Sequence, residues 1–179
     1  MGQVYVREIE TADYHDIYIL NQELGYYCPE EKVKERIEFI KKNTKDIVFV
    51  AEYNNKVIGY IHGSPYELLY SDSILDIRSF VVKEEYRSKG VGSLLINNLE
   101  CWAKEKGYSG IRVVSSFHRL NAHRFYEKHG FIHKKSQKNF LKILDNRCHV
   151  YSWFWSWIIV KTHIYLYTTV EILILYYQS

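Results

Sequence analysis

The residues with the clearest chemical potential form a glycine-containing turn, RSKGVG, at positions 87–92. A β-rich segment leads into this turn, and a helical pattern with regularly spaced leucines follows it directly. The first N–H groups of such a helix have no helical partners, and the helix dipole makes that end positive. Gly90 and Gly92 leave the backbone open to close approach, and Arg87 and Lys89 add positive charge. The turn is therefore predicted to bind a pyrophosphate group.

Two familiar phosphate-binding patterns do not fit this turn. The dinucleotide fingerprint GxGxxG fails because Leu95 occupies the position of its third glycine. The Walker pattern fails because no Gly-Lys-Ser or Gly-Lys-Thr sequence follows. By itself the turn also fits an ordinary strand, basic loop and helix that bind nothing, so its interpretation depends on the rest of the chain.

The elements that must position this turn are predicted from hydrophobic periodicity and from turn residues. Strands are expected at residues 3–9, 47–53, 57–64, 73–82, 111–115, 131–135 and 138–144. Helices are expected from Thr11 to Gly25, from about Pro29 to Lys42, over 90–106 and over 121–129. The order β-α-α-β-β-β-α-β-α-β-β predicts an α/β (α+β) domain, with about four helices flanking a mixed central sheet.

Two motifs carry a resemblance to a known family. RSKGVG resembles the pyrophosphate loop of the GNAT superfamily of acetyl-CoA-dependent N-acetyltransferases, whose pattern is Arg/Gln-x-x-Gly-x-Gly/Ala. RLNAHRFYEKHGF, residues 119–131, is similar to that family's second motif, and NFLKIL, residues 139–144, is similar to a common last strand. One position departs from the pattern, because Arg119 stands where asparagine is frequent and Asn121 is two residues out of register. The resemblance covers residues 3–144.

This resemblance implies a GNAT-type fold with a mostly antiparallel sheet, and an enzyme that uses acetyl-CoA as co-substrate without a metal. The acetyl group would pass to a primary amine of a small molecule or protein, by direct attack in a ternary complex. The alternative is a non-catalytic acyl-CoA-binding sensor or partner module of the same fold. The intact turn and the intact motif tyrosine, Tyr126, favour the enzyme.

Acetyl transfer to an amine needs a proton acceptor and a proton donor. An amine with a pKa near ~10.4 is mostly protonated at neutral pH, so a base must take its proton. By resemblance, Tyr126 is the general acid that protonates the departing thiolate. Asp76 is the predicted base, or equally a strand-end carboxylate paired with a neighbouring arginine or lysine. A period of two places it on one strand face with Arg78, Phe80 and Val82. Three other carboxylates are alternative bases: Glu52, Glu67 and Glu23.

The resemblance also predicts the contacts of the two substrates. The strand backbone would pair with the pantetheine arm of CoA, and the N–H of Val82 would stabilise the oxyanion. The predicted cofactor-binding residues are Phe80, Val81, Val82, Arg87, Ser88, Lys89, Gly90, Val91, Gly92, Ser93, Arg119, Asn121 and Tyr126. On the acceptor side, Tyr26 and Tyr27 are candidate contacts, or equally core and rim aromatics. The sequence contains no strong acidic cluster, which a polyamine or aminoglycoside acceptor would call for, so neither acceptor is predicted.

Composition narrows the partners and the compartment. The net charge of +3 is mild and the lysines are mixed with glutamates, which does not indicate nucleic-acid binding. The three cysteines, Cys28, Cys101 and Cys148, show no metal-ligand spacing and favour a reducing compartment. The first residues do not form a signal-peptide pattern. We therefore expect a cytoplasmic protein.

Residues 145–179 differ in kind, since they contain nine aromatic and only four charged residues. The alternation of Trp153, Trp155 and Trp157 predicts a hairpin or an added sheet edge. The alternatives are a membrane anchor, a homodimer contact through an apolar edge, and a read-through or frame-shifted end. The apolar run at 150–160 is shorter than the ~20 residues that span a membrane. We predict that residues 1–144 form the N-acetyltransferase domain and that the extension is dispensable for it.

Overall fold

The computed structural model describes residues 3–143 of the 179-residue chain. One compact unit ends at His133, and a second begins at Lys134. Within the second unit, the described residues 134–143 form neither helix nor strand. Every element and site below lies in the first unit.

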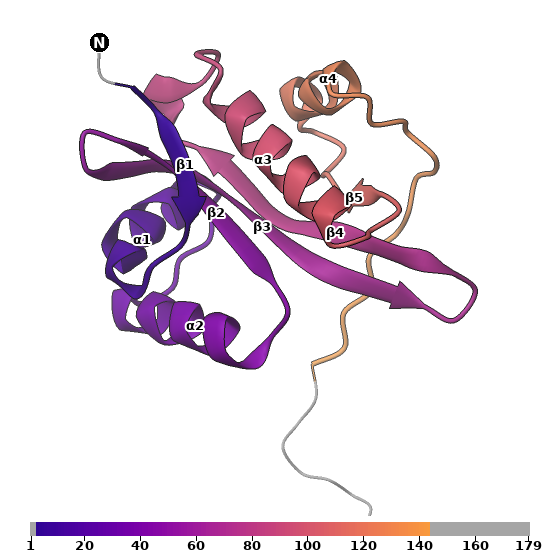
Figure 1. Cartoon of the computed structure of the whole chain (residues 1–179), viewed down its shortest axis with the longest axis horizontal. Coiled ribbons are helices and arrows are strands. Elements are labelled where there is room, and N and C mark those ends of the chain that lie inside the picture. The colour runs from indigo at the N-terminus through magenta and orange to yellow at the C-terminus, as the bar shows by residue number, and fades with distance from the viewer. Residues whose placement is uncertain (1–2, 144–179) are drawn as a thin grey trace, which may run out of the picture. The chain divides into compact units, whose positions relative to one another are not determined.

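A five-stranded sheet forms the centre of the first unit, in the order β1-β2-β3-β4-β5 (Figure 1). Its strands are β1 (Tyr5–Glu8), β2 (Ile47–Tyr53), β3 (Lys56–Leu68), β4 (Ser71–Val82) and β5 (Ile111–Val113). The first four strands pair antiparallel, and β5 is parallel to β4. The mixed, mostly antiparallel sheet predicted from the sequence is therefore confirmed. The β3–β4 hairpin is longer than predicted, because Pro65 lies inside β3 and not in a loop.

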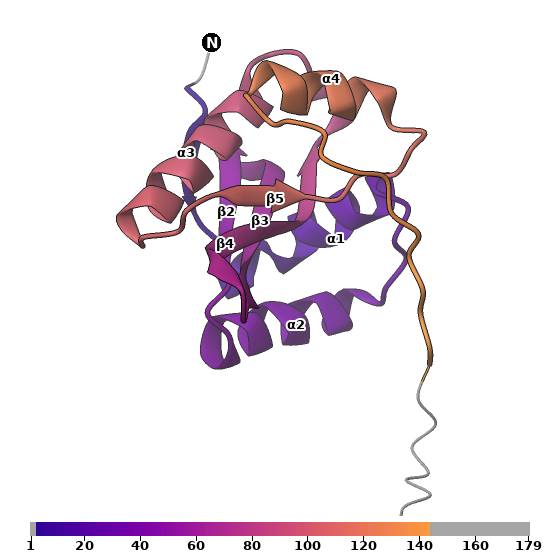
Figure 2. The same ribbon diagram turned by 90° about the vertical axis from the view of Figure 1, so that its right-hand side faces the viewer.

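Helices cover both faces of this sheet, as Figures 1 and 2 show. The helices are α1 (Tyr14–Glu23), α2 (Glu30–Asn43), α3 (Val91–Glu105) and α4 (Leu120–Lys128), with short 3-10 turns at Thr11–Asp13 and Glu84–Tyr86. Helices α1 and α2 lie on one face, and α3 lies on the other. None of the helices in residues 3–143 has the length and apolarity to cross a membrane.

The two faces of the sheet contribute to two separate cores. On the α3 face, Leu95 and Leu99 pack with Ile61 and Leu75. On the other face, Leu20 of α1 packs with strand residues that alternate with the first set. Because β2 is buried on both faces, its sequence IVFVAEY is almost continuously apolar and does not alternate.

A β-bulge interrupts β4 just before the cofactor segment predicted from the sequence. Gly63 of β3 is opposite Ile77 and His62 is opposite Ser79, so Arg78 is the extra residue. The bulge reverses the alternation of the strand, because Ile77 and Phe80, three residues apart, contact the same core. The prediction that Asp76 shares a face with Phe80 and Val82 is therefore wrong. A strict period of two cannot be carried across an inserted residue.

The two closing strands predicted at 131–135 and 138–144 are not observed in the described residues, which end at 143. Residues 131–143 form no sheet ladder, and every side chain from Ile132 to Ile143 is exposed. A strand is stabilised by a paired backbone and one buried face, and this segment has neither. Residue 144 and the predicted extension 145–179 lie outside the described residues.

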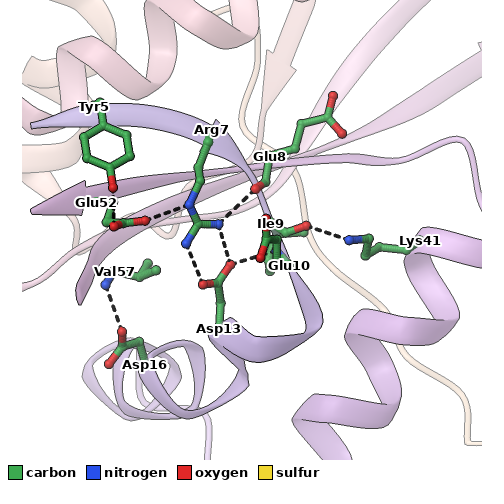
Figure 3. Close-up of polar contacts among 10 residues, drawn as sticks. All are labelled: Tyr5, Arg7, Glu8, Ile9, Glu10, Asp13, Asp16, Lys41, Glu52 and Val57. Carbon is green, nitrogen blue, oxygen red and sulfur yellow. Dashed lines mark hydrogen bonds and ion pairs between the residues drawn. The ribbon is translucent and has the colours of Figure 1, made fainter. Parts of the chain in front are cut away.

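An ion-pair network fixes β1 to its neighbours (Figure 3). The Arg7 guanidinium binds Asp13 through two N–H groups, at 2.7 and 2.8 Å, and binds Glu52 of β2 at 2.7 Å. The Tyr5 hydroxyl donates a second hydrogen bond to Glu52, and Asp13 accepts the backbone N–H of Glu10. Both carboxylates are buried, so one arginine joins β1, β2 and the start of α1.

Candidate active site

The turn between β4 and α3 leaves several backbone N–H groups without partners. Ser88 and Gly90 have positive φ angles of 59° and 86°, which turn the chain sharply into the helix. The N–H of Leu94 is bonded to the carbonyl of Gly90, at 3.0 Å. The N–H groups of Val91, Gly92 and Ser93 precede the first complete helical turn and therefore have no helical acceptors. They lie at the positive end of a 15-residue helix, which favours an anion.

The two basic side chains of the turn behave differently. Arg87 turns back, since its Nε donates to the carbonyl of Val82 at 2.9 Å and its Nη2 binds Glu23 of α1 at 3.0 Å. It ties the turn to the end of β4 and to α1. Lys89 is exposed, and its ammonium lies 5.5 Å from the centre of the Tyr86 ring. Lys89 is therefore the basic side chain of the turn that remains accessible to a ligand.

The edge of β4 is open after the bulge, because β5 pairs only with residues 75–77 of β4. The N–H of Lys83 donates to Ile58 of β3, at 2.8 Å. Backbone groups alternate in direction along an antiparallel strand, so the N–H groups of Phe80 and Val82 point away from β3. The backbone N–H of Val81 points toward β3 and is therefore not available at this edge. Two of the three predicted strand contacts thus have backbone donors available to an extended ligand.

Tyr126 lies beside this open edge, in a cluster of aromatic rings. Its ring centre is 6.4 Å from that of Phe80 on β4 and 5.5 Å from that of Phe131. Burial raises the pKa of Tyr126, and the nearby positive charge of Arg119 offsets part of this effect. The hydroxyl therefore remains protonated at neutral pH, which is the state that a proton donor needs.

Helix α4 lies near the start of α3 (Figure 2), and two side-chain contacts join them. A Cβ atom at Gly92 would lie 3.2 Å from the Phe125 ring, so only glycine leaves this ring its full space. The Nε2 atom of His129 is 3.0 Å from the Ser93 hydroxyl. Arg119 immediately precedes α4 and its side chain forms no capping hydrogen bond, and Asn121 is exposed in the first turn of the helix. The predicted residues of both motifs therefore belong to adjoining elements.

Asp76 is buried, with 4% of its surface exposed. It lies on the face of β4 opposite to the Phe80 side chain. One carboxylate oxygen binds Arg112 of β5 at 3.0 Å, and the other binds Arg78 at 3.1 Å. Both oxygens are thus engaged by guanidinium groups. The position gives Asp76 a clear role in joining β4 to β5. Its role as a base remains a prediction.

Sequence reasoning missed Ser115, which follows β5 by two residues. Its hydroxyl is buried and has no hydrogen-bond partner within the described part of the chain. A buried polar atom without a partner is unusual and calls for a ligand or water. In the sequence Ser115 appears only as the polar residue that ends the predicted strand 111–115, and nothing in that pattern indicates a buried hydroxyl.

The comparisons with known proteins agree with this geometry. The sequence model of the Acetyltransferase (GNAT) family matches residues 6–131. The chain belongs to the GNAT family. An N-acetyltransferase of Chlorobaculum tepidum without an assigned substrate is 31% identical to this acetyltransferase over 132 residues, which cover 72% of this chain and 81% of that protein.

Solved structures support the same fold for this acetyltransferase. A GNAT family acetyltransferase of Staphylococcus aureus aligns with a TM-score of 0.66 and 22% identity, over 80% of this chain and 100% of the other. An aminoglycoside N-acetyltransferase in complex with CoA aligns with a TM-score of 0.72 and 17% identity, over 79% and 96%. The GNAT fold and acetyl transfer predicted from the two motifs are therefore confirmed, and the non-catalytic alternative is not favoured.

Proposed function

We propose that this GNAT acetyltransferase binds acetyl-CoA along the turn at 87–93 and the open edge of β4, and acetylates a primary amine in a ternary complex. One observation carries the proposal. The partnerless N–H groups at the start of α3, the outward N–H groups of Phe80 and Val82, and the protonated Tyr126 lie on adjoining elements.

The residues of this region fit acetyl-CoA. The N–H groups of Val91, Gly92 and Ser93, together with Lys89, suit its pyrophosphate. The β4 edge suits the amides of the pantetheine arm, which can pair with a strand backbone. The buried hydroxyl of Ser115 supplies an additional polar atom that lacks a partner among residues 3–143.

The chemistry follows from these positions. The amine attacks the thioester carbon, a C–N bond forms, and the carbonyl oxygen becomes an oxyanion that the N–H of Val82 stabilises. The C–S bond then breaks with its electron pair on sulfur, and Tyr126 donates a proton to the thiolate. Asp76 is the base predicted from sequence, and an Asp76→Asn variant with an unchanged pH–rate profile would place the base elsewhere.

The proposed acceptor is a small molecule or protein amine, and the proposed compartment is the cytoplasm. Cys28 and Cys101 are free thiols, which is usual in a reducing compartment. A homodimer through residues 145–179 is a further proposal, which sedimentation of the full chain against a chain ending at 144 would test.

Calorimetry with acetyl-CoA and a thiol-release assay with a panel of amines test the proposed function. We expect acetyl-CoA to bind with measurable heat, and free CoA to appear only when an amine is present. Absence of acetyl-CoA binding by the purified chain would overturn the proposal.

A further inference from the structure

The carboxylates considered as bases already have partners. Each of the four has at least one polar partner. Asp76 accepts a hydrogen bond from Arg112 and forms an ion pair with Arg78. Hydrogen bonds reach Glu52 from Tyr5 and Arg7, Glu23 from Arg87 and the N–H of Glu84, and Glu67 from Ser73. In Asp76, Glu52 and Glu23 at least one of these partners is a guanidinium group. The reaction needs a base that the structure leaves available.

A cavity of about 190 Å³ lies between α1, α2 and the sheet. Six aliphatic side chains line it: Ile9, Ile17, Val33, Ile37, Ile40 and Val48. Tyr60 also lines it, and the Tyr60 hydroxyl donates a hydrogen bond to Asn21, at 2.6 Å. The cavity therefore has mainly apolar walls with a few fixed polar groups, as small-molecule sites usually do.

An imidazole lines the end of this cavity that reaches β4. His62 on β3 lines the cavity, and its Nε2 is 2.8 Å from a carboxylate oxygen of Asp46. Because a carboxylate accepts, Nε2 carries the hydrogen, and Nδ1 of the neutral ring keeps a free lone pair. This is the arrangement of a general base with an orienting carboxylate.

The cavity reaches β4 at Ser79, one residue before the proposed thioester site. Ser79 lines it and is the cross-strand partner of His62. Ser79 directly follows the bulge residue Arg78 and precedes Phe80, whose N–H faces the open edge. The cavity on one face of β4 and the proposed thioester site on its edge therefore meet at consecutive residues.

The charge of the lining indicates the class of acceptor. Arg36 of α2 is the only residue of the lining that carries a full charge, and the lining contains neither aspartate nor glutamate. Among the described residues Arg36 forms no salt bridge, and it stacks on the exposed Phe39 ring at 4.8 Å. A polycationic acceptor would be repelled here, whereas a carboxylate would be attracted.

We infer that the cavity between α1, α2 and the sheet binds a compact amine with an apolar body and a carboxylate, such as an apolar amino acid, and that His62 takes the proton of its ammonium group. The inference rests on the proposed acetyl transfer. Arg36 binds the carboxylate, the aliphatic walls hold the body, and Asp46 positions the imidazole.

The proton balance of the step is simple. The ammonium group gives one proton to Nδ1 of His62, and the free amine attacks the thioester carbon. The amide nitrogen loses a second proton as the tetrahedral intermediate collapses, and this proton replaces the one that Tyr126 gives to sulfur. His62 releases its proton to water, so one proton is released for each amide formed.

A base role is tested with full-length His62→Gln, with His15→Gln as the matched control because His15 is exposed and outside the cavity lining. We expect kcat/KM with leucine to fall about 10²- to 10⁴-fold in His62→Gln, as loss of a general base does. The difference in kcat/KM between His62→Gln and wild type should become smaller as pH rises, because more of the amine is then unprotonated. Asp46→Asn should alter the same pH–rate profile. The other ionisable groups that line the cavity are Arg36, Tyr60 and Cys28.

Substrate class is tested by comparing leucine with leucinamide and with spermidine. Wild type should prefer leucine, and Arg36→Gln should abolish the preference over leucinamide. A preference for spermidine would overturn the assignment of the acceptor class.

The outcomes separate this inference from the proposed function. If His62→Gln and Asp46→Asn bind acetyl-CoA and keep wild-type rates and pH profiles, the inference about His62 is wrong and acetyl transfer stands. If wild type neither binds acetyl-CoA nor releases thiol with any amine, the proposed function itself fails.

Discussion

At the scale of single residues, the surroundings of each ionisable group decide what it can do with a proton. Burial raises the pKa of both Tyr126 and Tyr60, so their hydroxyl groups remain donors. Asp76 is buried between two guanidinium groups, which engage both of its oxygens. His62 differs from the buried tyrosines and from Asp76, because its Nε2 is hydrogen-bonded to Asp46 while Nδ1 keeps a lone pair.

The proton-donor role of Tyr126 predicts a specific kinetic change. Tyr126→Phe keeps the ring contacts with Phe80 and Phe131 and removes only the hydroxyl. We expect kcat to fall about 10²-fold or more, because general acid catalysis is lost, with little change in acetyl-CoA affinity. Stopped assays and calorimetry measure the two quantities. Tyr70→Phe, at the exposed tip of the β3–β4 hairpin, should match wild type, and an unchanged kcat in Tyr126→Phe would remove this role.

The network around Arg7 predicts a dependence of stability on pH. Hydrogen bonds from Tyr5 and then from Arg7 lower the pKa of Glu52 below its ordinary value of 4.5. The unfolded chain therefore binds this proton more readily than the folded chain. The stabilisation is present above about 4.5 and is lost as pH falls through the folded-state pKa.

Glu52→Gln should therefore be less stable than wild type near neutral pH, and its free energy of unfolding should fall less steeply at acid pH. Urea denaturation across that range measures both effects. Glu8→Gln is the control, since Glu8 is an exposed carboxylate on the same strand. Parallel curves for Glu52→Gln and wild type would contradict the prediction.

At the scale of elements, the contact between α3 and α4 couples cofactor binding to the proton donor. In Gly92→Ala the new Cβ would lie 3.2 Å from Phe125, so the ring and α4 must shift by a few tenths of an ångström. We expect kcat to fall by about tenfold, because small displacements of a catalytic group are costly. Gly110→Ala is the control, since its Cβ would meet Ile74 at an ordinary 3.6 Å. Equal rates for the two variants would show that α4 adapts freely.

At the scale of the whole molecule, the sequence predicted most of the fold, because long periodic segments such as α2 and α3 carry their own signal. It also predicted the turn at 87–93, where glycine spacing and helix start coincide. The bulge at Arg78 was missed, since no residue type marks an inserted position. The dyad of His62 and Asp46 was missed because 16 residues separate its members, and only the pairing of β2 with β3 brings them together. The prediction of two closing strands was wrong because apolar residues at 139–143 do not by themselves provide a partner strand.

The proposed domain boundary gives a prediction at this scale. The family match ends at residue 131, and every residue of the proposed site lies before it. A chain that ends at Leu144 should therefore keep kcat/KM close to that of the full chain, as thiol release would measure. Circular dichroism reports whether the shortened chain folds. Loss of activity in a folded, shortened chain would assign a catalytic contribution to residues 145–179.

The single extra residue in β4 lies where the pairing of β4 with β5 ends. Upstream of Arg78, odd-numbered side chains enter the core beneath α3, and downstream the even-numbered ones do. Deletion of Arg78 would make Ile77 and Ser79 consecutive, and these two residues already face opposite sides of the sheet, so every other side chain of β4 would keep its face. The deletion would remove only the local distortion of the ladder, at the point where β5 stops pairing with β4.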